Sequence, residues 1–216
     1  MQINRYLLEY NSWKYFFLLT GFAVLTTFAI NYLFLTEGLY YQSYSMQLAA
    51  KRIAKMIEVS QKWQWIGYVF VPIIILMRVC FTSICIYIGC FLTNIKVGFN
   101  QLFKVGLLAD FVFVLAGIIK LVILIFFKDI STISDLQFQP LSLLELFDRN
   151  SVDPLFIYPF SLISVFEMLY WLALAGLLSS VINQPFGNSL KTVASSYGIG
   201  LLLWVLFVMF LTVNLN

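Results

Sequence analysis

Residues 65–92 read WIGYVFVPIIILMRVCFTSICIYIGCFL, and Arg78 is the only charged residue in this run. About 20 consecutive apolar residues are enough to cross the ~30 Å hydrocarbon core of a bilayer as an α-helix. A strand of a membrane barrel would instead be a shorter segment of alternating polarity. This stretch therefore predicts a transmembrane helix.

The rest of the chain has the same character. Of 216 residues, 62% are hydrophobic and 11% are charged, whereas soluble domains average about 45–50% and 25%. The composition leaves too little polar sequence for a separate soluble domain, so we predict one membrane domain over residues 1–216. The predicted fold is an all-α bundle of five transmembrane helices at residues 15–35, 65–92, 102–127, 155–182 and 193–213.

Residues 46–60 carry apolar side chains on one side of a helical period and basic side chains on the other. A basic face opposite an apolar face is typical of a helix that lies in the headgroup plane of a membrane. We predict such an interfacial amphipathic helix after the first span; a helix packed on the end of the bundle is the alternative. Its basic face comprises Lys51, Arg52, Lys55 and Lys62.

Charged residues inside the spans are the candidate site. An unpaired charge at the bilayer centre costs about 2.5–3.5 kcal/mol on insertion scales. Arg78 and Glu167 lie near the middle of spans that run in the same direction, so we predict that they pair or share a pocket, with Asp110 as a further member. Lys120 completes the cluster, and we expect its long side chain to reach toward the acidic segment 128–154.

Two interpretations of this cluster remain open. It is either a structural salt bridge that fixes the register of the helices, or a site for a proton, an ion or a substrate. The two acids and two bases balance, and a cation path usually has surplus acids along it. This balance favours the structural interpretation.

Small residues recur at a spacing of four in the fourth and fifth predicted spans, and such faces let helices approach closely. We predict that these two spans pack against each other; a homodimer face is the alternative. The face comprises Ala175, Gly176, Ser179, Ser180, Ala194, Ser196, Gly198 and Gly200.

The residue inventory argues against several kinds of site. The chain has no histidine, and Cys80, Cys85 and Cys90 each turn about 140° around a helix from the last, so they do not converge on a metal. No glycine-rich phosphate loop is present. We therefore predict no catalytic residue, metal or cofactor. A net charge of +3, with no basic face beside aromatic residues, predicts no nucleic-acid partner.

Two segments resemble a known family. Residues 94–105 (NIKVGFNQLFKV) and 166–177 (FEMLYWLALAGL) are similar to the turn before span three and to span four of the Yip (Ypt/Rab-interacting) membrane proteins, in the bacterial branch. The resemblance extends over residues 15–213 as a pattern of five spans. It implies a scaffold or accessory subunit in a bacterial inner membrane.

The predicted function is therefore a non-enzymatic scaffold or accessory subunit that contacts another integral membrane protein, or a second copy of itself, within the lipid. The alternative is a small transporter or channel with its polar site at Arg78, Glu167 and Asp110. Lysines in the short turns 93–101 and 183–192 favour an N-terminus on the inner side.

Overall fold

The computed structural model describes residues 12–215, and its long elements are α-helices. Within this range, five helices are long and apolar enough to cross a membrane. The prediction of an all-α bundle with five spans is confirmed. The spans are Ser12–Phe34, Ala50–Leu92, Phe99–Phe126, Val165–Ile182 and Phe186–Asn214.

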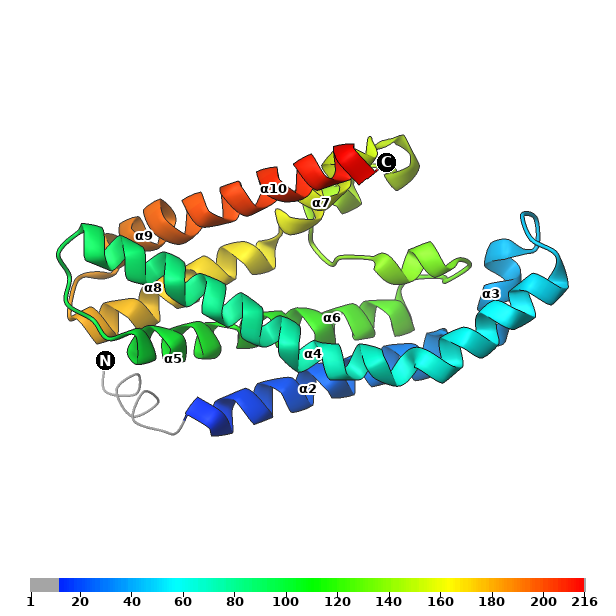
Figure 1. The fold of residues 1–216 in the computed structure, drawn as a ribbon, viewed down its shortest axis with the longest axis horizontal. Coiled ribbons are helices and arrows are strands. Elements are labelled where there is room, and N and C mark those ends of the chain that lie inside the picture. Colours follow the sequence, from blue (N-terminus) through cyan, green and yellow to red (C-terminus); the bar gives the residue numbers. More distant parts are fainter. Residues whose placement is uncertain (1–11, 216) are drawn as a thin grey trace.

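Successive spans run in opposite directions through the bundle (Figure 1). α2 (Ser12–Phe34) is followed by α3 (Glu37–Tyr44), and α4 (Ala50–Leu92) returns beside α2. The end of the bundle where α2 begins also holds the α4–α5 and α8–α9 turns. The other elements are α5 (Phe99–Ala109), α6 (Phe111–Phe126), η1 (Ile133–Gln137), η2 (Leu143–Leu146), η3 (Arg149–Ser151), α7 (Pro154–Leu162), α8 (Val165–Ile182), α9 (Phe186–Val193), the π-helical turn η4 (Ala194–Gly198) and α10 (Ile199–Leu215).

The predicted amphipathic helix 46–60 is not a separate element. From Ala50 onward its residues form the beginning of α4, a continuous helix of 43 residues. No glycine or proline interrupts residues 50–66, so nothing in the backbone ends the helix before the apolar span begins. At 1.5 Å per residue α4 is about 65 Å long, roughly twice the thickness of a hydrocarbon core.

The early part of α4 packs against α3 rather than standing alone. Ile53 and Ile57 are buried, 1% and 6% exposed, and Leu39 of α3 is buried as well. The hydroxyls of Tyr40 and Ser60 share a hydrogen bond of 2.7 Å. α3 and the start of α4 thus form a hairpin that extends beyond the other helices at one end (Figure 1).

The predicted span 155–182 is wrong as a single helix, because the chain is extended at Ile163 and Ser164. The Leu143 amide donates to the carbonyl of Ile163 at 2.8 Å, and the Val165 amide donates to the carbonyl of Leu141 at 3.1 Å. The loop before α7 therefore satisfies backbone groups that the break frees. Only α8 is a candidate span here.

The third and fifth spans are also interrupted. α5 and α6 meet at Asp110, whose carbonyl accepts from the Phe113 amide in a tight, 3₁₀-type bond of 3.0 Å. In the fifth span, η4 joins α9 to α10. The predicted limits 102–127 and 193–213 become Phe99–Phe126 and Phe186–Asn214.

Two clusters of buried side chains hold the bundle together. One lies where α4, α5, α8 and α9 meet, and includes Ile86, Leu102 and Leu174. The other joins α2 to α4, α5 and α6 around Leu19 and Val79. Arg78 is adjacent in the chain to Val79 of the second cluster, and Asp110 is adjacent to Ala109 of the first.

Candidate functional site

An ion pair between α4 and the α5–α6 joint is the centre of the candidate site. Arg78 Nε donates to Asp110 Oδ1 at 2.7 Å, and Nη2 donates to Oδ2 at 2.6 Å. This two-pronged geometry is the strongest form of the arginine–carboxylate contact. The Phe113 ring lies beneath the guanidinium, 4.2 Å from ring centre to Cζ. Asp110 is fully buried, but 34% of the Arg78 side-chain surface is accessible.

Tyr170 of α8 lies directly beside this pair. Its side chain is fully buried, and its hydroxyl shares a 2.9 Å hydrogen bond with Thr82 Oγ1, one turn along α4 from Arg78. Its ring centre lies 4.9 Å from that of Phe113 and 5.6 Å from that of Tyr197. Tyr170 therefore connects the ion pair to the last two spans.

Glu167 lies in the first turn of α8, where aromatic donors hold its carboxylate. Trp171 Nε1 donates to Oε1 at 2.9 Å, and the Tyr197 hydroxyl donates to the same oxygen at 3.0 Å. Ser164 Oγ accepts from the Glu167 amide at 3.1 Å and so caps the helix. The N-terminal end of a helix carries a partial positive charge, which favours an acid here.

Three departures from regular α-helix meet at this site. Asp110 occupies the joint between α5 and α6, Glu167 follows the break before α8, and Tyr197 lies in the π-helical turn η4. Broken transmembrane helices and π-helical turns are frequent at functional sites. Three hydrogen-bonded groups, which the ring contacts of Tyr170 with Phe113 and Tyr197 bring together, form what we call the polar network: Arg78, Thr82, Asp110, Glu167, Tyr170, Trp171 and Tyr197.

The sequence predicts that Arg78 and Glu167 pair or share a pocket; direct pairing is wrong, but both residues lie in the polar network. The prediction assumed that Glu167 lies at mid-span, but the break at residues 163–164 places it in the first turn of α8. Asp110 takes both hydrogen-bonding edges of Arg78 instead. Glu167 still lies within the electrostatic influence of both residues.

Lys120 is not part of the polar network. It is half-buried on α6, and Glu145 in η2 is the acid that acts on it most strongly. The sequence predicted a balance of two acids and two bases. Because Lys120 lies outside the network, the network holds two acids and one base. One negative charge is therefore in surplus when both carboxyls are ionised.

The small residues of the last two spans have several different neighbours. A Cβ added to Gly198 would clash with the Trp171 ring of α8, so this glycine lets the two spans approach. A Cβ at Gly200 would meet Cys85 Sγ of α4, and Ser196 packs closely on Gly89 of α4. The other members are Ala175 and Ser179, which are buried, Ser180, which is half-buried, Ala194, which is exposed, and Gly176, whose added Cβ would meet nothing within 4 Å.

The basic residues Lys51, Arg52, Lys55 and Lys62 are all exposed on the part of α4 that extends beyond the bundle. Among the described residues, none of the four makes an ion pair. They lie far along α4 from the polar network, so the two charged regions are separate.

The aromatic and hydroxyl members of the network were not predicted from the sequence. Tyr170 and Trp171 follow Glu167 by three and four residues, which places them on the same helical face, and this spacing was a usable signal. Tyr197 and Thr82 come from other spans, and no local pattern connects them to Glu167.

Comparisons with protein-family models, curated proteins and solved structures find no match to this chain. The resemblance to the Yip family therefore stays a prediction.

Proposed function

We propose that this protein is a small transporter or channel in which Glu167 takes up and releases a proton. The observation that carries the proposal is the meeting of three helix interruptions at a network with one surplus acid. The surplus acid is Glu167, with which no basic side chain of residues 12–215 forms an ion pair. Intramembrane ionisable residues commonly form the relays of proton-moving proteins.

The surroundings of Glu167 fit a proton better than a metal ion. Oε1 accepts both hydrogen bonds to its side chain, one from the indole N–H of Trp171 and one from the hydroxyl of Tyr197. A hard metal cation needs a shell of several oxygen ligands. Residues 12–215 contain no group of three or more metal-ligating side chains of the histidine, cysteine or carboxylate type.

Arg78 is the member of the polar network at which we expect water to enter. A charged side chain at membrane depth faces either the bundle interior or water, because contact with hydrocarbon is costly. The accessible third of the Arg78 side chain is therefore expected to face water inside the bundle.

Proton flux into liposomes tests the proposal. The full chain is reconstituted with a pH-sensitive dye inside, and a pH gradient is imposed with potassium and valinomycin present. The wild type is expected to equilibrate pH faster than empty liposomes, and E167Q is expected to lose this flux. E58Q, which changes an exposed glutamate of α4 in the same way, should keep it. Equal flux in the wild type and E167Q would refute the proposal, as would no flux above empty liposomes.

An accessory subunit is the second candidate function. Its support is the open space at Gly176 of α8, because a Cβ added there would meet nothing within 4 Å among the described residues. Faces of this kind serve as contact surfaces between transmembrane helices. Purification in mild detergent tests it: a stoichiometric membrane partner is expected, and G176L should release that partner while leaving the chain folded.

For location, we propose the bacterial inner membrane with the N-terminus inside. The bundle end that holds the start of α2 carries Lys14, Lys96 and Lys191, two of them in or next to short turns. Lysines in short loops are enriched on the cytoplasmic side. Cysteine labelling at residue 96 from either side of the membrane tests this orientation.

A further inference from the structure

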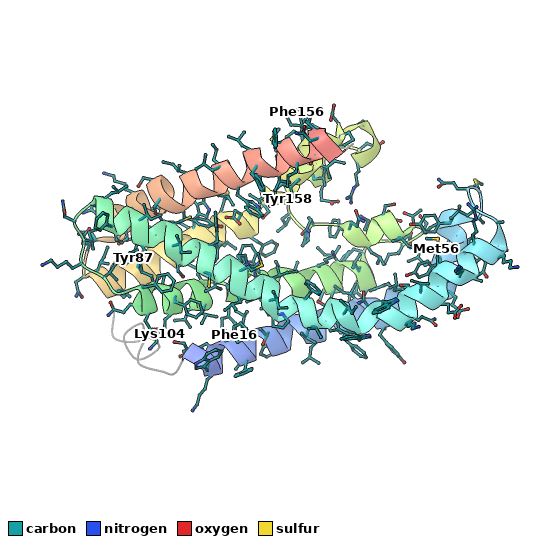
Figure 2. All side chains as sticks on the ribbon, in the orientation of Figure 1. Phe16, Met56, Tyr87, Lys104, Phe156 and Tyr158 are labelled. Atoms are coloured by element: carbon teal, nitrogen blue, oxygen red, sulfur yellow. The ribbon has the colours of Figure 1, made fainter. Side chains whose placement is uncertain are left out.

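An open cavity of about 780 Å³ lies between α3, the beginning of α4 and η1. Its volume is within the range of sites that bind small ligands. The cavity is formed by the hairpin that extends beyond the bundle, far from the polar network. Figure 2 places Met56, one of its lining residues, in this part of α4 beside α3.

Cations and apolar side chains line the cavity together. Arg52 and Lys55 supply two positive charges, and no acidic residue is among the lining residues. Neither cation makes an ion pair within residues 12–215. Leu48, Met56 and Val59 supply an apolar wall. The matching ligand carries a negative charge at one end and a hydrocarbon chain at the other.

The order of these residues along α4 gives the ligand a direction. Trp63 and Trp65 are 52% and 58% exposed, and exposed tryptophans of a transmembrane helix mark the membrane interface. Met56 and Val59 lie between the two cations and these tryptophans, so this part of the apolar wall is on the membrane side, whereas Leu48 lies on the other side of the cations. This is the orientation of a lipid whose headgroup points away from the bilayer centre.

We propose that this cavity binds one anionic phospholipid of the surrounding bilayer. Arg52 and Lys55 hold the phosphate, the hydroxyls of Tyr40 and Ser60 lie at the wall as polar neighbours, and an acyl chain runs along Met56 and Val59 toward the membrane. A lipid held here would attach the α3–α4 hairpin to the bilayer surface.

Native mass spectrometry of the detergent-solubilised full chain tests the proposal, with phosphatidylglycerol and phosphatidylcholine of identical chains as probes. One phosphatidylglycerol should be retained about thirtyfold better than phosphatidylcholine, since two cations that each favour binding of an anionic lipid by about 1 kcal/mol give about 2 kcal/mol together. R52Q/K55Q should lose the preference. K51Q/K62Q removes the same charge from the same helix outside the cavity and should keep it.

A second pair of variants separates the cavity from general surface charge. V59W places an indole ring where the acyl chain would lie, without changing charge, and should weaken the preference. V69W alters a valine of α4 that is 50% exposed and lies outside the cavity, and it should have no effect. Equal retention of both lipids by the wild type would overturn the proposal. So would equal losses in the two double variants, or a preference that V59W leaves intact.

Discussion

The Tyr197 hydroxyl donates a 3.0 Å hydrogen bond to Oε1 of Glu167, and this bond joins the π-helical turn of the last span to the first turn of α8. The same carboxylate oxygen accepts from Trp171 on its own helix. Glu167 is thus oriented by two spans at once, although no basic side chain in the described part of the chain pairs with it.

Y197F is expected to destabilise the protein by about 0.6–2 kcal/mol, the usual range for a hydrogen bond between transmembrane helices. The thermal midpoint in detergent measures this change. Y87F is the matched control, because Tyr87 is 43% exposed and lies outside the polar network. A midpoint for Y197F equal to that of Y87F would mean that the bond to Glu167 contributes nothing.

D110N is expected to cost about 3–5 kcal/mol, because it leaves the Arg78 charge without its buried partner. The double variant R78Q/D110N removes both charges and should recover part of that loss. K120M changes a cation outside the network, and we expect it to be neutral or stabilising. Thermal unfolding of the four proteins in one detergent gives the comparison. If the double variant is no more stable than D110N alone, the ion pair is not the source of the loss.

G89A is expected to destabilise the bundle by about 1–3 kcal/mol through overpacking. The added Cβ would overlap the Ser196 side chain, where α4 and η4 come closest. G176A is the control, since a Cβ there meets nothing within 4 Å and alanine favours helix over glycine. Unfolding midpoints should fall for G89A and hold or rise for G176A; the reverse order would contradict this packing.

The hydrogen bonds of Asp135, in the first turn of η1, predict that the stability of the preceding loop depends on pH. Partial burial favours its neutral form, but hydrogen bonds from Thr132 and Ser131 outweigh burial and hold the pKa of this carboxyl below its usual value. A lowered folded-state pKa means that the contribution to stability is present above the unfolded value of about 3.9 and is lost as pH falls through the folded value.

Hydrogen exchange at the Ser131 and Thr132 amides, which donate to Asp135 Oδ2, measures this effect. D135N should speed exchange at neutral pH, and its difference from the wild type should narrow in acid. D129N, which changes an acid in the loop before η1, should exchange like the wild type. A D135N difference that persists unchanged in acid would contradict the assignment.

Most of the fold follows from hydropathy. Long apolar runs predict five helical spans because the backbone has to bond internally in lipid, and this holds whatever the tertiary contacts are. The break at Ile163 does not follow, because residues 155–182 are mostly apolar and Glu167 is the only charged residue among them. Its cause is the loop residues Leu141 and Leu143, which pair with the extended chain.

The candidate site was predicted in part. Hydropathy identifies Arg78, Asp110 and Glu167 as costly residues that need partners. Which acid pairs with Arg78 depends on the depth and rotation of the helices. Because of the break before α8, Glu167 lies in the first turn of that helix and not at the predicted depth. The close contact of Gly89 with Ser196 likewise joins the second and fifth spans, a pairing that spacing within one span does not specify.

Infrared difference spectroscopy of the full chain between acidic and alkaline pH shows most directly whether Glu167 takes up and releases a proton. If Glu167 exchanges a proton with water, the wild type should show a protonated-carboxyl band that E167Q lacks and E58Q retains. Identical difference spectra for the wild type and E167Q would contradict proton exchange at Glu167, because Glu167 would then keep one protonation state throughout.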